Sequence, residues 1–151
     1  MGSILIGMAV PRPIDPRGPR FNQAVLATAL LIGFVLDWRW VIPVGAVVLA
    51  AGAFLGPQYG PFLRLYADVI KPRLRPPAHL EDPRPPRFAA AVGTVFLTLG
   101  SVALLVGVPA VAWALALIVA GLAAFAAATG ICVGCQVWLF AARRRRIELA
   151  A

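Results

Sequence analysis

The chain has 151 residues, of which 61% are hydrophobic and only 13% are charged, and its formal net charge is +8. A soluble domain has about 45–50% apolar and about 25% charged residues, so this composition argues against a water-soluble domain and for an integral membrane protein. The basic residues form no groove interleaved with aromatic residues, so we do not expect nucleic acid as a partner. They flank apolar segments instead, where they would face the lipid bilayer and its anionic headgroups.

A sequence motif is repeated within the chain. DPRGPRF at residues 15–21 returns as DPRPPRF at residues 82–88, which is 67 positions further on, and six of the seven positions are identical. Each copy is followed by a long apolar run. Self-similarity at a fixed distance indicates a repeat architecture. We call these two segments the Asp-Pro-Arg motifs, and they predict a protein of two similar halves.

The first half begins with a tail and basic motif over residues 1–20, of which residues 11–20 are predicted to be extended because proline disfavours helix. The first repeat spans residues 21–71. Its predicted elements are helices from about Phe21 to Leu36 and Val41 to Leu55, then an interfacial helix from Phe62 to Lys71. One continuous helix would place Asp37 and Arg39 at the bilayer centre, at about 2.5–3.5 kcal/mol each, so two helices are favoured.

The second half begins after a basic, proline-rich cytoplasmic linker over residues 72–87. The second repeat spans residues 88–146 and is followed by a tail over residues 147–151. It contains predicted helices from about Phe88 to Val106 and Ala110 to Ala128. A single helix through Ala142 would be about 50 Å long, but the bilayer core is about 30 Å thick. We therefore expect a break near residues 130–134 and a short terminal helix.

The predicted fold is all-α, with four transmembrane helices arranged as two tandem hairpin repeats and with short interfacial helices. Basic residues cluster before the first helix, in the linker and at Arg143–Arg146. The positive-inside rule then places both termini in the cytoplasm, in a multi-pass protein of the plasma (inner) membrane. Repeats of equal orientation are expected to be related by an axis along the membrane normal.

Cys132 and Cys135 are the only cysteines and are the candidate catalytic residues. A Cys-x-x-Cys pair can cycle between dithiol and disulfide, and a helix N-terminus favours the reactive thiolate, whereas apolar burial opposes it. Two alternatives stay open. Cysteine also behaves as a small buried hydrophobe, and a zinc site would need two further ligands from a partner chain. We expect no resident cofactor and no metal.

The Asp-Pro-Arg motifs supply a second candidate site. Four arginines at the membrane surface could bind an anion such as phosphate, sulfonate or a lipid headgroup; they are Arg17, Arg20, Arg84 and Arg87. The structural alternative is that each Asp caps a helix or pairs with an Arg, and we favour it. No carboxylate, lysine or histidine lies within the predicted spans, so nothing indicates a proton relay.

The segment from Asp15 to Gln23, the second Asp-Pro-Arg motif and the late Cys-x-x-Cys resemble a family of small bacterial four-helix membrane proteins. That family is catalogued only as a domain of unknown function. The resemblance covers the chain from about Ile14 to Arg146 and implies a membrane location and four spans. Members of the family often accompany thioredoxin-like and sulfurtransferase proteins, which implies a thiol role for Cys132 and Cys135.

The resulting functional hypothesis is a membrane thiol–disulfide or sulfur-relay protein that exchanges with a cytoplasmic thioredoxin-like partner. A first alternative is a non-catalytic accessory or assembly subunit, packed by its small residues against a larger membrane complex. A second is a small-solute carrier that works as a dimer, and a homo-oligomer is among the possible assemblies. Whether the protein is an enzyme is left open by the sequence.

Overall fold

A computed structural model describes residues 13–56 and 60–150, without the side chains of 147–150. The fold of these residues is all-α. Within those residues there are six α-helices and no strand. Two short π-helices and one 3₁₀-helix complete the set of elements. In chain order they are α2 (Arg17–Val35), α3 (Val41–Ala50), η1 (Ala51–Leu55), α4 (Pro61–Leu65), η3 (Tyr66–Ile70), η4 (Lys71–Arg73), α5 (Arg84–Leu105), α6 (Pro109–Thr129) and α7 (Val133–Ala150).

Helices α2 and α5 begin inside the Asp-Pro-Arg motifs, so the expectation of extended chain up to Arg20 is wrong for residues 17–20. The reason is the aspartate of each motif. Asp15 Oδ1 accepts the backbone N–H of Arg17 at 3.0 Å, and Asp82 Oδ1 accepts that of Arg84 at 2.9 Å. Each carboxylate thus satisfies a free N–H at a helix start, and proline is tolerated in a first turn.

The other helix boundaries follow the sequence closely. The segment α3–η1 ends at Leu55, and Gly56 has φ 115°, where the glycine break is predicted. Helix α6 ends at Thr129, within one residue of its predicted end. Helix α7 is longer than expected, with 18 residues. The predictions for residues 1–12 lie outside the described residues.

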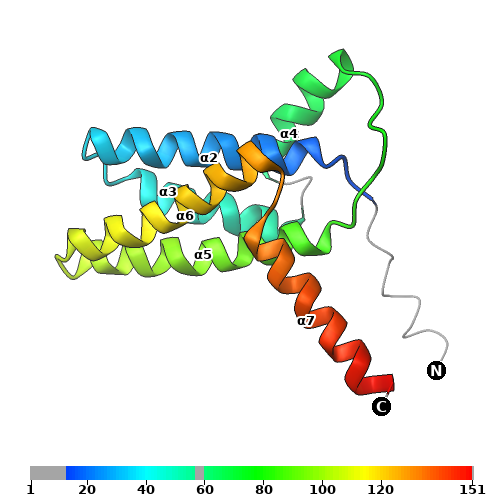
Figure 1. Ribbon diagram of the computed structural model, residues 1–151. Helices are drawn as coiled ribbons and strands as arrows, with labels where there is room; N and C mark the ends of the chain where they lie inside the picture. The colour runs from blue at the N-terminus through cyan, green and yellow to red at the C-terminus, as the bar shows by residue number, and fades with distance from the viewer. Residues whose placement is uncertain (1–12, 57–59, 151) are drawn as a thin grey trace.

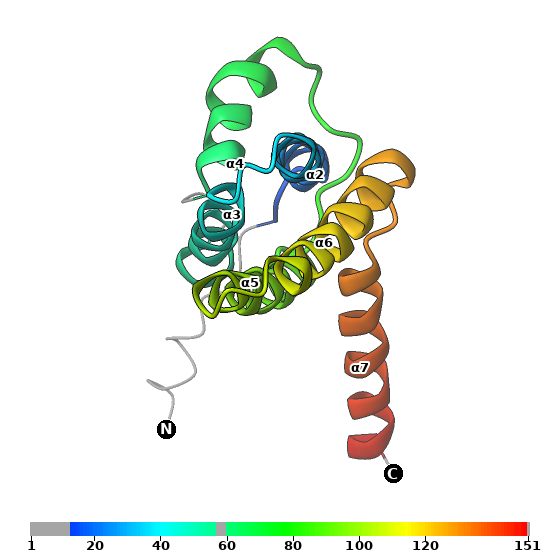
Figure 2. The same ribbon diagram turned by 90° about the vertical axis from the view of Figure 1, so that its left-hand side faces the viewer.

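Helices α2, α3, α5 and α6 form one bundle, seen from the side in Figure 1 and along its length in Figure 2. Helix α2 packs mainly against α6, and α3 packs mainly against α5, while α2 and α3 touch each other much less. The first helix of each repeat therefore rests on the second helix of the other repeat. The buried centre of the bundle includes Leu30, Ile42 and Leu97.

The two repeats meet at equivalent residues just before the Asp-Pro-Arg motifs. The N–H of Ile14 donates to the carbonyl of Glu81 at 2.9 Å, and the N–H of Glu81 donates to the carbonyl of Ile14 at 2.9 Å. Glu81 is 67 positions after Ile14, the distance that separates the motifs. Because this bridge joins equivalent residues and each first helix packs on the second helix of the other half, the two halves have an approximate pseudo-twofold relation.

The second arginine of each motif crosses to the other repeat. Arg87 Nε donates to the carbonyl of Ala53 at 3.0 Å, and its second nitrogen donates to Phe54 at 3.5 Å, at the end of η1. Arg20, the equivalent residue, donates to the carbonyl of Ala127 at 3.4 Å near the end of α6. Arginine at a helix C-terminus satisfies free carbonyls and complements the helix dipole. Each repeat thus caps the second helix of its counterpart.

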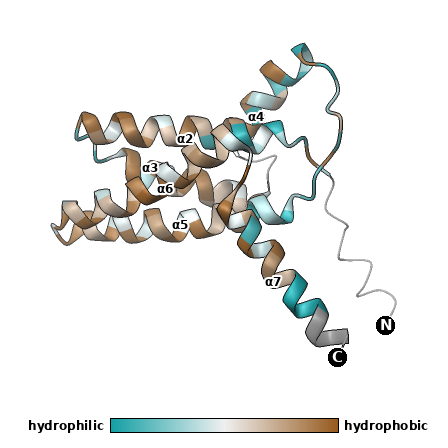
Figure 3. Cartoon of the chain, viewed as in Figure 1, coloured by the Kyte–Doolittle hydropathy of each residue, from teal (hydrophilic) through white to brown (hydrophobic). Residues whose placement is uncertain are grey.

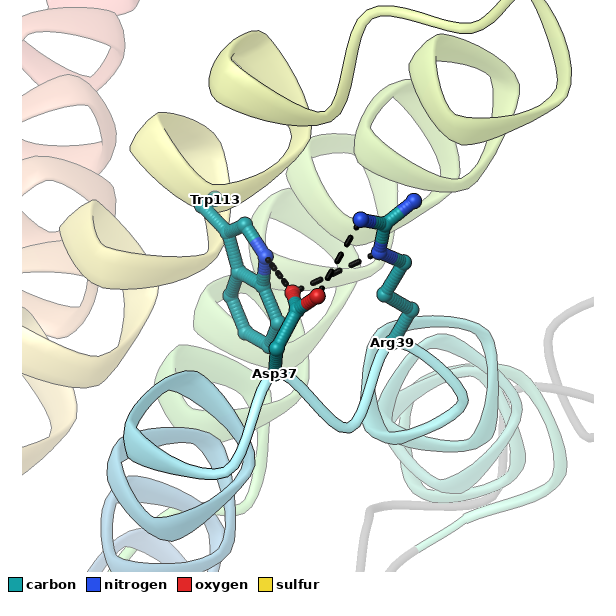
Figure 4. A network of polar contacts seen from close by, with 3 residues as sticks. All are labelled: Asp37, Arg39 and Trp113. Carbon is teal, nitrogen blue, oxygen red and sulfur yellow. Dashed lines mark hydrogen bonds and ion pairs between the residues drawn. The ribbon is translucent and has the colours of Figure 1, made fainter.

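At the opposite end of the bundle, Asp37 joins the α2–α3 turn to α6 (Figure 4). Its carboxylate accepts a hydrogen bond from Trp113 Nε1 at 3.1 Å and from Arg39 at 3.1 and 3.3 Å. These hydrogen bonds, that from Arg39 first, lower the pKa of Asp37. Asp37 has φ 48°, a left-handed conformation that ends α2, and the N–H of Trp38 closes the turn on the carbonyl of Gly33 at 2.7 Å.

Helices α5 and α6 are long and apolar enough to cross a membrane, by length and composition. In the most apolar stretch of each, 22% and 39% of the residues are buried, so the larger share of each stretch is at least partly exposed. Figure 3 shows the same pattern, with hydrophobic residues along the bundle and hydrophilic ones gathered near the Asp-Pro-Arg motifs and on α7.

Substitution of Arg87 tests the cross-capping. We expect Arg87→Met to lower the free energy of unfolding by about 1–3 kcal/mol, because two helix-end carbonyls lose their donor. Arg84→Met is the matched control, since the Arg84 guanidinium reaches only the exposed Asp82, and it should change stability by less than about 0.5 kcal/mol. Thermal unfolding of the purified protein followed by circular dichroism measures both. Equal effects would contradict the cross-cap.

Candidate thiol site at the start of helix α7

The thiol site is created where α6 ends and the chain turns back. Gly130 has φ 77° and its N–H donates to the carbonyl of Ala126 at 2.9 Å, which ends α6 in a left-handed cap. Two residues later the carbonyl of Cys132 accepts the N–H of Gln136 at 3.0 Å. Cys132 is therefore the N-cap residue of α7, and Cys135 lies in the first turn. This agrees with the predicted break near residues 130–134.

Cys132 occupies the position where a serine or aspartate oxygen commonly accepts the free N–H groups of a helix start. The groups that lower its pKa are the Cys135 thiol, the backbone N–H groups of Cys135 and Gly134, and the Gln23 side chain. These groups, the Cys135 thiol first, lower the pKa of Cys132 to about 6, against the opposing effect of its half-burial. This shift favours the thiolate form of Cys132.

Cys135 has the opposite character. Its thiol donates to the Cys132 thiolate, which raises the pKa of Cys135, and burial and the negative charges of Cys132 and Glu81 raise it further. The two opposite shifts favour a negative charge on Cys132 and a proton on Cys135. Unequal pKa values within a Cys-x-x-Cys motif are what a nucleophile and its resolving thiol require.

Gly134, inside the motif, sets the contact between α7 and α5. A Cβ added there would lie 2.7 Å from Ala89 Cβ and 3.0 Å from Ala89 Cα. The neighbour is partly backbone, so the helices would have to move apart. A glycine at this position lets the start of α7 pack directly on the start of α5, while the rest of α7 extends away from the bundle (Figure 1).

A cavity of about 140 Å³ lies beside Cys132, between α2, α3, α5 and α6. Most of its wall is apolar, with Leu26, Leu49 and Phe96 among the lining residues. Its polar side chains are few: the lining also includes Asn22, Gln23, Arg87 and Cys132. Cys135 does not line it. The two sulfurs therefore differ in surroundings as well as in charge.

The arginines of the second candidate site do not converge on one point. Arg17 donates to the carbonyl of Arg75 at 3.2 Å, and Arg84 lies 3.6 Å from Asp82. Arg20 and Arg87 reach helix ends, as described above, and of the four only Arg87 lines the cavity. All four have a partner within the chain. The helix-capping alternative accounts for both aspartates, and anion binding by these arginines stays a prediction.

Two neighbours of the cysteines were not anticipated from the sequence: Gln23, in the second turn of α2, and Glu81, next to the second Asp-Pro-Arg motif. Both are distant from Cys132 along the chain, and no local pattern connects them to it. Among residues 13–56 and 60–150, no three His, Cys, Asp or Glu side chains gather closely enough to hold a metal ion.

Comparison with known proteins agrees with the resemblance found in the sequence at the level of the family. Neither a curated protein nor a solved structure matches the chain. A family model described as a domain of unknown function, DUF4395, matches residues 14–143, which include both Asp-Pro-Arg motifs and the Cys-x-x-Cys pair. The chain therefore belongs to the DUF4395 family.

Proposed function

We propose that this protein is a membrane thiol–disulfide exchange protein whose redox pair is Cys132 and Cys135. The observation that carries the proposal is the place of Cys132 at the N-cap of α7 with Cys135 in the first turn, where the pKa of Cys132 is lowered and that of Cys135 is raised. A low pKa in a partly exposed, positively polarised site is typical of a reactive thiol.

The partner in this proposal is a cytoplasmic thioredoxin-like dithiol. A partner thiolate attacks the sulfur of Cys135 in the oxidised pair, the Cys132–Cys135 bond breaks, and Cys132 leaves as the thiolate. Cys132 is the better leaving group because its pKa is the lower. The second partner thiol then attacks the partner sulfur of the mixed disulfide, and Cys135 departs and takes up a proton. The partner is oxidised and the pair is reduced by two electrons.

The membrane part of the proposal is that α2 and α3–η1 span the bilayer beside α5 and α6. The pseudo-twofold relation supports this, because it makes the two halves counterparts within one bundle. Large apolar side chains of both elements face outward; they include Leu31, Ile32, Val35, Val44, Val47 and Phe54. The segment α3–η1 is short, at about 23 Å, and local thinning of the bilayer would accommodate it.

The orientation follows from charge and aromatic residues. The Asp-Pro-Arg motifs, the linker and the arginines of α7 are at one end of the bundle, which the positive-inside rule assigns to the cytoplasm. Trp38 and Trp40 are at the other end and are 60% and 74% exposed, as in an aromatic belt at the lipid–water interface. The exposed arginines Arg17, Arg20 and Arg84 would then meet anionic headgroups.

Labelling of single cysteines tests this orientation. In a variant that lacks both native cysteines (C132S/C135S), we expect an impermeant maleimide to label W38C in right-side-out membrane vesicles. L74C, in the linker, should be labelled only after the vesicles are opened. The opposite pattern would reverse the orientation, and labelling of both sites in closed vesicles would contradict a membrane-spanning bundle.

The pH dependence of alkylation tests the thiolate. Alkylation requires the thiolate, whose fraction rises as pH rises through the pKa, so the rate at Cys132 should be half-maximal near pH 6 rather than near the ordinary value of about 8.5. Gln23→Leu should move the midpoint up by about one unit, since one hydrogen bond to a charged group is worth at least about 1.4 kcal/mol.

Asn22→Leu is the matched control for that experiment. Asn22 is next to Gln23 and also lines the cavity, but it is not among the groups that act on the pKa of Cys132. Its alkylation profile should coincide with that of the wild type. A wild-type midpoint at or above the ordinary cysteine value would refute the N-cap thiolate.

Thiol trapping in glutathione buffers tests the redox pair and separates the proposal from its main alternative. We expect both thiols to lose alkylation together, in one two-electron transition, and C132S or C135S to abolish that transition. Thiols that react independently in every buffer would mean that the cysteines only fill space. The protein would then be better explained as an accessory subunit of a larger membrane complex.

A further inference from the structure

Exchange with a protein partner does not use the cavity beside Cys132. The position of the cavity suggests a separate role for it. This inference rests on the proposed function, since a pair that accepts two electrons from a partner must pass them on. Cys132 lines the cavity and Cys135 does not. Both cysteines are half-buried, and a molecule inside the cavity meets only Cys132, which leaves Cys135 for the protein partner. The two sulfurs thus face two different reaction partners.

The size and wall of the cavity limit what it can hold. Its volume, about 140 Å³, is close to that of the apolar cavity of about 150 Å³ that holds a benzene molecule in an engineered protein. The cavity therefore fits one six-membered ring. The amides of Asn22 and Gln23 and the guanidinium of Arg87 are the lining groups able to donate hydrogen bonds to ring oxygens.

The route into the cavity is through its apolar wall. Val92 on α5 and Ile118 and Leu122 on α6 line the cavity and are also 39%, 48% and 46% exposed. These are the two helices long and apolar enough to cross a membrane. A ligand that enters between such side chains comes from the lipid phase, and its apolar tail can stay there.

We propose that the cavity binds the ring of a lipid-dissolved quinone, which accepts the two electrons of the Cys132–Cys135 dithiol. The Cys132 thiolate adds to the quinone ring, and a proton goes to a ring oxygen. Cys135 then loses its proton and attacks the Cys132 sulfur; the sulfur–carbon bond breaks, and its electron pair returns to the ring. The products are the Cys132–Cys135 disulfide and, after uptake of the second proton, the hydroquinone.

Filling the cavity from a glycine tests the proposal. Gly52 lines the cavity and a Cβ added there meets no atom within 4 Å; Gly121 is equally open but does not line the cavity. We expect reduced wild-type protein in proteoliposomes to reduce decylubiquinone, followed by ultraviolet absorbance and by loss of thiol alkylation. Gly52→Leu should slow this reaction at least tenfold, and Gly121→Leu should leave it unchanged.

Asn22→Leu provides a second test should Gly52→Leu fail to fold. It should raise the quinone concentration needed for half-maximal rate about tenfold, while the pH profile of Cys132 alkylation stays the same. Glutathione titration of each variant separates the two levels of the proposal. A pair that titrates normally but never reduces the quinone overturns the quinone site alone, and so does equal slowing by Gly52→Leu and Gly121→Leu. A pair that never forms a disulfide overturns the exchange function.

Discussion

The structure depends on the reciprocal contact between its two halves at the Asp-Pro-Arg motifs. A backbone bridge joins Ile14 to Glu81, and Arg20 and Arg87 each cap a helix of the other repeat. Neither half is complete alone, because the second helix of each needs an arginine from its counterpart. Residues just before and within the first turn of α2 and α5 thereby fix how the four helices meet, at the end of the bundle where the cavity lies.

The thiol site lies where the pseudo-twofold relation breaks down. In the first repeat, α4 and η3 fold back onto the start of α2, and the buried Tyr66 donates its hydroxyl to Asp15 at 3.2 Å. In the second repeat, α7 folds back onto the start of α5, and the cysteine pair is found there instead. One half thus closes its folded-back segment with a tyrosine–aspartate hydrogen bond. The other places its cysteine pair at the corresponding position.

Local sequence signals predicted most of the helices, since the glycine breaks near Gly56 and Gly130 and the apolar runs between them depend on neighbouring residues. They misplaced the starts of α2 and α5, because the prolines of the motifs were given more weight than the carboxylates of Asp15 and Asp82. The cysteine pair was identified from its spacing. Its neighbour Gln23 was not identified, because a contact between the first and last parts of the chain follows from tertiary packing. No periodic pattern in the sequence reports such a contact.

The electrostatics of Cys132 follow from its place at a helix start beside an apolar cavity. Burial alone would raise the pKa of a thiol, and an apolar cavity makes water scarce. The N–H groups of Gly134 and Cys135 offset that cost, because they are fixed donors that need no reorganisation when charge develops. The same N–H groups would stabilise any negatively charged group that occupies the position of the Cys132 sulfur. A thiolate can therefore form next to an apolar ligand without leaving the protein interior.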